Sequence, residues 1–245
     1  MTSPNAHDQP NEPPRTPQQH SPAESSLPIE PIDQQAIGTW LDRLAANTPA
    51  PGGGAVAALT AAIGAALGSM VISYTRGKKA FRDQEDELAE AHARLTTIRT
   101  MLLNLAAEDA DAYARLNALM KLPDDHPDRQ THWADAVRNA IDVPRAGLAT
   151  CVSLARLLDG LLGRSNQWLA SDLAIAAALA AAGARAFSFN VIVNLPQLDD
   201  IADQQDLLAQ TSAMTRTAQE LASNITQTVA QSLAGEIQSS SAAAP

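Results

Sequence analysis

Residues 48–54 (TPAPGGG) and the run behind them, residues 55–75 (AVAALTAAIGAALGSMVISYT), decide how this chain folds. Two prolines end any preceding helix, and three successive glycines free the backbone at the start of the next element. The 21 residues that follow carry no charge and are mostly Ala, Gly, Leu, Ile and Val. Glycines placed in this way allow the backbone to touch a close neighbour, which is either another helix or a ligand.

This apolar run is long enough to span a bilayer. Thr60, Ser69 and Ser73 interrupt it, however, and Ala and Gly dominate it, so its hydrophobicity is marginal for membrane insertion. Gly64 and Gly68 have the spacing that lets two helices approach closely. We therefore expect a buried helix in a soluble protein without a membrane partner, and we expect it to end near Gly77.

Apolar residues recur at helical spacing along most of the remaining chain. We predict helices over residues 34–47, 83–121, 129–162 (with a kink or stop at Val143-Pro144), about 166–195 and 203–237. No segment shows the alternation of a β-strand, and eight aromatic residues are few for a sandwich core. The sequence predicts an all-α fold, a bundle of long, closely packed helices with no sheet.

The two ends of the chain differ in composition from its centre. Residues 1–31 hold 8 of the 15 prolines and no large apolar cluster, so we predict a disordered tail there. Residues 238–245 are expected to be a second disordered tail. One helical domain is predicted between them, over residues 32–237.

Charge and cysteine content limit the partners and the compartment. The net charge is −10 without a basic stripe, which argues against nucleic-acid binding. The single Cys151 cannot form an internal disulfide, and the N-terminus lacks an apolar signal core. A cytoplasmic protein is expected, with Cys151 as an ordinary core residue.

Asp109 interrupts the apolar seam of the segment 83–121, on the stripe that Leu102 and Leu105 begin. A carboxylate on a packed face is costly unless it is paired, and otherwise its pKa rises. One interpretation is a buried ion pair with Lys78, Lys79 or Arg115. The other is an acid/base group or a counter-ion for a cationic substrate.

Asp172 falls near the middle of a broad apolar arc, formed by Leu169, Leu173, Ile175, Leu179 and Phe187. No basic residue lies within one helical turn of it, so a local salt bridge does not explain it. Since helical residues are expected to precede it, a role in proton transfer is favoured over helix capping.

Residues 76–79 (RGKK) form the densest positive cluster of an acidic chain. They either compensate the dipole at a helix C-terminus or clamp an anion. Asn190 and Asn194 share one helix face, and Asn190 lies about 27 Å from Asp172 along a continuous helix. A site that contains both therefore requires the fold or a second subunit to bring them together.

No metal or nucleotide motif is present. His126 and His132 lie near three aspartates, but their spacing matches no standard zinc site and fits a solvated loop. The glycines at 52–54 follow no strand, and neither a Walker loop nor GxGxxG occurs.

Five blocks in order resemble the cyclodeaminase/cyclohydrolase family, which includes the C-terminal domain of formiminotransferase-cyclodeaminase and bacterial methenyltetrahydrofolate cyclohydrolases. The resemblance covers roughly residues 37–200. The blocks are residues 51–81 (PGGGAVAAL, GAALGSMV and GKKAF within them), 108–113 (EDADAY), Val143-Pro144, Ser171-Asp172 and 190–195 (NVIVNL).

The resemblance implies an all-helical enzyme, usually a homodimer, that handles one-carbon units on tetrahydrofolate without a metal or redox cofactor. The leading expectation is hydrolysis of 5,10-methenyltetrahydrofolate to 10-formyltetrahydrofolate by acid/base catalysis. One alternative is a formimidoyltetrahydrofolate cyclodeaminase that releases ammonia, whose substrate would arrive by diffusion. The other is a non-catalytic helical scaffold with the same fold.

The resemblance also implies a set of site residues. Asp172 is expected to be the general acid/base, Asp109 the counter-ion or orienting group, and Lys78 the group that fixes or polarises the folate. Lys79 is expected to meet the glutamate tail. The remaining substrate-binding residues are expected to be Gly52, Gly53, Gly54, Thr75, Asn166, Ser171, Asn190 and Asn194. Free N–H groups at a helix start favour a polar ligand, so the glycine turn is interpreted as a pocket wall.

The chain departs from the family pattern Gly-Asn-x-Asn-x-x-Ser-Asp, which stands here as SNQWLASD. Ser165 replaces the glycine and Trp168 replaces the second asparagine, while Ser73 and Arg76 depart in the first block. The lost asparagines favour the scaffold alternative, and the retained Asp109, Asp172 and lysines favour an enzyme.

Overall fold

The computed structural model describes residues 36–242, and the predicted tail over residues 1–31 lies outside this range. The described part contains no strand, which confirms the all-α prediction. Its α-helices are α1 (Ile37–Ala45), α2 (Gly53–Ser73), α3 (Glu85–Met120), α4 (Pro127–Asp159), α5 (Ala170–Ile192) and α6 (Ile201–Ala242). Short 3₁₀ helices precede α3 and flank α5: η2 (Lys79–Gln84), η3 (Gln167–Leu169) and η4 (Leu195–Gln197).

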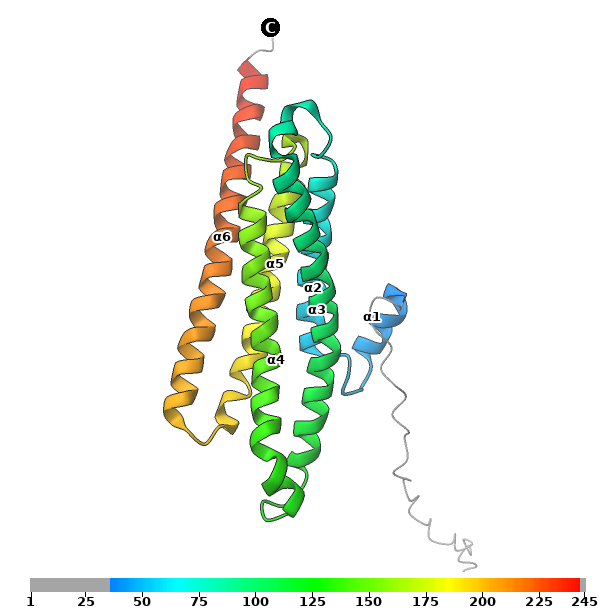
Figure 1. Ribbon diagram of the computed structural model, residues 1–245, viewed down its shortest axis with the longest axis vertical. Helices are drawn as coiled ribbons and strands as arrows, with labels where there is room; N and C mark the ends of the chain where they lie inside the picture. The colour runs from blue at the N-terminus through cyan, green and yellow to red at the C-terminus, as the bar shows by residue number, and fades with distance from the viewer. Residues whose placement is uncertain (1–35, 243–245) are drawn as a thin grey trace, which may run out of the picture.

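The helices α2 to α5 form an up-and-down bundle in which each helix packs antiparallel against the next, and α2 closes the ring against α5 (Figure 1). In Figure 1, α3 and α4 lie in front of α2 and α5. The longest helix, α6, packs on α4 and α5. The short α1 stands beside the start of α2 and is anchored by the buried Trp40.

The contact between α2 and α5 depends on small residues. A Cβ built on Gly64 would lie 2.9 Å from the carbonyl oxygen of Ala176, and one on Gly183 would lie 2.8 Å from the Cβ of Ala61. Both distances are shorter than van der Waals contact, so only glycine fits at either position. The prediction of close helix packing at Gly64 is confirmed.

Two segments pass the length and composition test for a membrane span, Gly53–Ser73 and Gln167–Gln197. The bundle buries 61% of the first apolar window and 44% of the second. Core helices of soluble proteins pass the same test. The outer sides of α2 and α5 nonetheless remain uncovered by the described part of the chain.

Pro144 does not stop α4, so of the kink or stop predicted there the stop is excluded. The helix runs unbroken from Pro127 to Asp159 with Pro144 inside it. Proline has no N–H to offer the carbonyl four residues earlier, here that of Ala140. Asn194 Nδ2 donates to this oxygen at 2.9 Å. A side chain from the end of α5 thus replaces the missing helical hydrogen bond.

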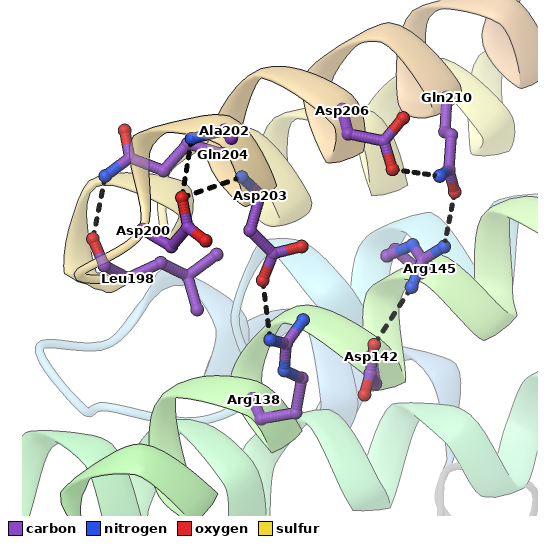
Figure 2. Close-up of polar contacts among 10 residues, drawn as sticks. All are labelled: Arg138, Asp142, Arg145, Leu198, Asp200, Ala202, Asp203, Gln204, Asp206 and Gln210. Carbon is purple, nitrogen blue, oxygen red and sulfur yellow. Dashed lines mark hydrogen bonds and ion pairs between the residues drawn. The ribbon is translucent and has the colours of Figure 1, made fainter.

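Polar contacts fix the start of α6 against α4 (Figure 2). Arg138 pairs with Asp203 at 2.6 Å, and Arg145 donates to Gln210 at 2.8 Å. Asp200 caps the helix by accepting from the N–H of Ala202. The helix extends to Ala242, beyond the predicted end at Ile237. Residues 238–242 are therefore helical, contrary to the predicted tail.

Candidate active site

A cavity of about 580 Å³ opens at the end of the bundle where α2 begins. Its walls come from the glycine turn, the C-terminal part of α3 and the end of α5. Among the predicted site residues it is lined by Gly52, Gly53, Gly54, Asp109, Asn190 and Asn194. We call this end of the bundle, with these residues, the glycine end. Its lining residues include no Lys, Arg or His.

Asp109 is the carboxylate of the cavity. It is half-buried on α3, and burial raises its pKa above the ordinary value. Within residues 36–242 its carboxylate has no ion pair or hydrogen bond, so the interpretation as a buried ion pair is not supported. The alternative remains: a desolvated group that is able to exchange protons or to balance a positive charge.

Gly54 makes room for Asp109. A Cβ built on Gly54 would lie 2.8 Å from Oδ1 of Asp109 and closer still to Oδ2. One on Gly53 would lie 3.3 Å from Oδ1 of Asn190. The glycine turn therefore lines the cavity, as predicted, but the close neighbours that require it are two side chains of the protein itself.

Asn190 and Asn194 lie one helical turn apart at the cavity wall. Asn194 Nδ2 donates both to the Ala140 carbonyl and to the Asn190 carbonyl, at 2.9 and 3.0 Å. The buried Nδ2 of Asn190 has no hydrogen-bond partner among the described residues. Asn194 is thus committed to holding the wall, whereas Asn190 has a free donor beside Asp109's cavity.

The opposite end of the bundle holds the other predicted site residues: Thr75, Lys78, Lys79, Asn166, Ser171 and Asp172. We call this set the lysine end. Lys78 and Asn166 line a second cavity, of about 670 Å³, beside Trp168 and the C-terminal half of α6. Lys78 and Lys79 are exposed, and neither forms an ion pair within residues 36–242. Trp168 is 81% exposed.

Thr75 has a structural role at the lysine end. Its buried hydroxyl donates to the Val71 carbonyl at 2.7 Å and accepts from the N–H of Asn166 at 3.0 Å. Asn166 in turn caps η3 by accepting from the N–H of Trp168. These bonds tie the end of α2 to the segment that enters α5, so the Thr75 hydroxyl is already occupied.

Asp172 lies in the first turn of α5 and is half-buried. The predicted apolar arc around it is only partly buried, because Ile175 is exposed while Leu173 and Phe187 are in the core. Only the short η3 precedes Asp172, so it lies at a helix N-terminus, where a carboxylate is favourable. Ser171 precedes it on the exposed side of the same turn.

The single chain does not bring Asp109, Lys78 and Asp172 together. The 21 residues of α2 separate the two ends by about 30 Å. The arrangement within one chain is therefore a cavity with a desolvated carboxylate and a free amide donor at one end. Unpaired lysines lie at the other.

The structure adds three polar lining residues to the cavity at the glycine end, Tyr113, Asn117 and Gln197. Tyr113 and Asn117 follow Asp109 at intervals of four, so the helical period of α3 already placed them on its face. Gln197 lies in η4, after α5, and no sequence pattern indicated it.

Comparison with known proteins finds one family over most of the described chain. A family model described as formiminotransferase-cyclodeaminase matches residues 36–213. The chain is 33% identical to a methenyltetrahydrofolate cyclohydrolase of Methylorubrum extorquens, over 80% of this chain and 96% of that one. It is 31% identical to the formimidoyltransferase-cyclodeaminase of Sus scrofa, over 78% of this chain but 36% of that one.

A solved structure has the same fold. The formiminotetrahydrofolate cyclodeaminase of Thermotoga maritima superposes with a TM-score of 0.71 at 26% sequence identity. The match covers 81% of this chain and 99% of that one.

Proposed function

The chain belongs to the formiminotransferase-cyclodeaminase family, and on that premise we propose that it is an enzyme that hydrolyses 5,10-methenyltetrahydrofolate to 10-formyltetrahydrofolate. The cyclohydrolase of Methylorubrum extorquens is matched over nearly its whole length, so the part compared corresponds to a complete enzyme of that name. The observation that carries the proposal is Asp109, a desolvated carboxylate without a partner in the described chain, in a cavity of ligand size.

The substrate suits this cavity electrostatically. The methenyl bridge between N5 and N10 is a cation, and Asp109 is the charged lining residue of a cavity that contains no cation. A carboxylate close to that carbon stabilises the positive charge most strongly where water is excluded. The free Nδ2 of Asn190 is available to donate to a carbonyl or ring nitrogen of the pterin.

The reaction requires one proton acceptor and one proton donor. Water adds to the methenyl carbon, and Asp109 accepts the proton that the water loses. The resulting carbinol is neutral at this carbon. Its C–N5 bond then breaks as the hydroxyl proton leaves and N5 receives a proton, which yields the 10-formyl group. One proton is released overall, and Asp109, with its pKa raised toward the working pH, is suited to pass it on.

A second candidate is the cyclodeaminase reaction, and the fold shared with the Thermotoga maritima enzyme favours it. In that reaction N10 attacks the carbon of a 5-formimino group and ammonia leaves. The same cavity serves, because this carbon also develops positive charge beside a base. Neither reaction changes an oxidation state, so we propose no redox cofactor.

The test is the decay of methenyltetrahydrofolate absorbance with the purified protein, against a blank without protein because the substrate hydrolyses spontaneously. We expect acceleration by the wild type and a loss of roughly 10²-fold or more for Asp109→Asn. Asp111→Asn is the matched control, since Asp111 is an exposed carboxylate of the same helix. A wild-type rate in Asp109→Asn would remove Asp109 from the mechanism. Ammonia release from 5-formiminotetrahydrofolate instead would select the cyclodeaminase.

A further inference from the structure

The proposed substrate has two chemically different halves. The pterin half is a fused ring with a carbonyl oxygen, O4, and N–H groups on its edge, whereas the aminobenzoyl-glutamate half ends in two carboxylates. The cavity at the glycine end is lined by the amide side chains of Asn117, Asn190, Asn194 and Gln197, and by no Lys, Arg or His. An amide both donates and accepts hydrogen bonds without carrying a charge. The lining therefore matches the pterin half.

The same lining opposes the carboxylates of the other half. A carboxylate that leaves water is costly unless a cation or several hydrogen-bond donors meet it. Asp109 already contributes one negative charge to the cavity, and it repels a second one most strongly where water is excluded. We therefore expect the glutamate end of the substrate to stay in solvent, outside the cavity.

Asp109 and Asn190 lie side by side in the cavity wall. They are the side chains for which two consecutive glycines, Gly54 and Gly53, make room. A Cβ built on Gly53 would lie 3.3 Å from Oδ1 of Asn190 and 4.0 Å from its Nδ2. Oδ1 is thus the atom nearer to the start of α2, where the free N–H groups of the first turn favour an acceptor. Nδ2 is left for another partner.

The amide of Asn190 differs from that of Asn194, one helical turn further along α5. Asn194 Nδ2 donates to two carbonyl oxygens of the protein, at 2.9 and 3.0 Å. Nδ2 of Asn190 is buried without a hydrogen-bond partner among the described residues, which destabilises the ligand-free protein. A ligand that supplies an acceptor removes this cost. The broad torsion about the Cβ–Cγ bond allows Nδ2 to turn toward such a ligand.

The bonding of the pterin places an acceptor beside the reacting carbon. O4 is attached to ring atom C4, N5 is the neighbour of the adjacent ring atom C4a, and the methenyl carbon is attached to N5. O4 and the methenyl carbon therefore lie along one edge of the molecule, as Asn190 and Asp109 lie along one wall of the cavity. The benzoyl carbonyl of folate lies far from this edge, beyond N10.

We propose that the cavity binds the pterin half of the folate, with Nδ2 of Asn190 donating to O4 and Asp109 against the methenyl carbon, while the aminobenzoyl-glutamate half lies outside. This inference rests on the proposed function for the identity of the ligand and adds the orientation in which it binds. It makes Asn190 the residue that distinguishes a pterin with an oxygen at C4 from one with an amino group there, because two donors do not bond to each other.

The two halves are tested as separate molecules by isothermal titration calorimetry. The pterin fragment is 6-methyltetrahydropterin, and the tail fragment is p-aminobenzoyl-glutamate. We expect the wild type to bind the pterin fragment, and Asn190→Leu to weaken that binding by roughly 10- to 100-fold. Binding of the tail fragment should not respond to this substitution. Failure of the wild type to bind the pterin fragment, or binding of the tail fragment that depends on Asn190, would overturn the proposal.

The contact with O4 is tested with a ligand pair. The partner of the pterin fragment is 2,4-diamino-6-methyltetrahydropteridine, which carries an amino group at C4 in place of the oxygen. In Asn190→Leu the ratio of the two affinities should shift by roughly 10-fold toward the amino form. Asn104→Leu removes an exposed amide of α3 outside the cavity and should leave the ratio at its wild-type value. A wild-type ratio in Asn190→Leu would remove the contact with O4.

Thermal stability separates a binding role from a structural one. Asn190→Leu replaces an unpaired buried donor by an apolar group, so it should raise the Tm of the free protein and reduce the Tm increase that the pterin fragment produces. A lower Tm in the free protein together with an unchanged ligand-induced increase would assign Asn190 to structure and overturn the proposal. Asn190→Asp keeps the shape of the side chain without the donor, and it serves the same titrations where Asn190→Leu does not fold.

Steady-state kinetics give a further readout. The bond to O4 is made in the ground state and in the transition state alike, so Asn190→Leu should raise KM by roughly 10- to 100-fold and leave kcat nearly unchanged. A loss confined to kcat would contradict this orientation. The calorimetric and thermal readouts need no turnover. A protein that binds the pterin fragment through Asn190 without hydrolysing methenyltetrahydrofolate would therefore refute the proposed function alone.

Discussion

Gly54→Ala isolates the contact on which the proposed site depends. The added Cβ would lie 2.8 Å from Oδ1 of Asp109, and nearer to Oδ2, where about 3.4 Å or more is ordinary contact. The carboxylate must therefore move by more than about 1 Å. A displacement of about 1 Å already costs on the order of 10²-fold in rate when the group takes part in the chemistry. We expect that loss in the methenyltetrahydrofolate assay.

The stability of the same variant should barely change. Alanine is favoured over glycine in a helix by about 0.5–1 kcal/mol, and displacing Asp109 from its rotamer costs about 0.5–1.5 kcal/mol. In an Asp109→Ala background the displacement cost vanishes, so Gly54→Ala should then stabilise the fold. The double-mutant cycle should show a coupling free energy of about 1 kcal/mol in urea unfolding.

Gly38→Ala is the matched control. Gly38 is also the second residue of a helix, α1, but a Cβ built there meets nothing within 4 Å. It should leave the activity unchanged and show no coupling to Asp109→Ala. Full activity in Gly54→Ala together with zero coupling would refute the contact between Gly54 and Asp109 as the determinant of the site.

Three further substitutions test the surroundings of the two ends. Because burial raises the pKa of Asp109 in the folded state, the charge of this carboxylate destabilises the fold at neutral pH. Asp109→Asn should therefore raise the Tm at pH 7. The gain should disappear as the pH falls below 3.8, the ordinary pKa of Asp, because the carboxyl is then protonated in both the folded and the unfolded wild type. Equal gains at pH 7 and pH 3 would contradict this. Asn194→Leu leaves the Ala140 carbonyl without a hydrogen-bond donor and should lower the free energy of unfolding in urea by about 1–3 kcal/mol. The loss should be smaller in a Pro144→Ala background, because residue 144 then has a backbone N–H that can donate to this carbonyl. Equal costs in both backgrounds would show that Asn194 does not replace that hydrogen bond. Thr75→Val removes the acceptor for the Asn166 N–H and should cost about 1–3 kcal/mol, whereas Thr75→Ser should cost less; similar losses would assign the effect to packing.

Helical periodicity was sufficient to predict the fold. Leu95, Leu102 and Leu105 of α3 are buried as their spacing predicted, and Asp109 lies half-buried on the same stripe. Of the two alternatives predicted at Pro144, a kink or a stop, the stop does not occur. A proline predicts a break from local rules alone, and the compensating donor, Asn194, is 50 residues further along the chain. No local pattern contains such a pairing.

The site was harder to predict, because sequence motifs that belong to one family do not show how far apart their residues lie in the folded chain. The expected site contained Asp172, Lys78 and Asp109 together. The directions in which the helices run place Asp172 and Lys78 at one end of the bundle and Asp109 at the other. The role of Gly54 was predicted only in part. The sequence indicated a close neighbour, and only the packing of α3 against α2 identified it as the Asp109 side chain.

Because the helices are synthesised in order, α2 is complete long before the helix on which it packs. Its uncharged surface is complete when Ser73 has been made, but α5, against which Gly64 and Gly183 pack, begins at Ala170. At about 5–20 residues per second, the ribosome takes roughly 5–20 s to supply it. Throughout that interval the nascent chain presents a 21-residue apolar helix without its final partner. The interval between codons 73 and 170 is therefore the period in which α2 is most exposed to aggregation, and in which chaperone binding would protect it.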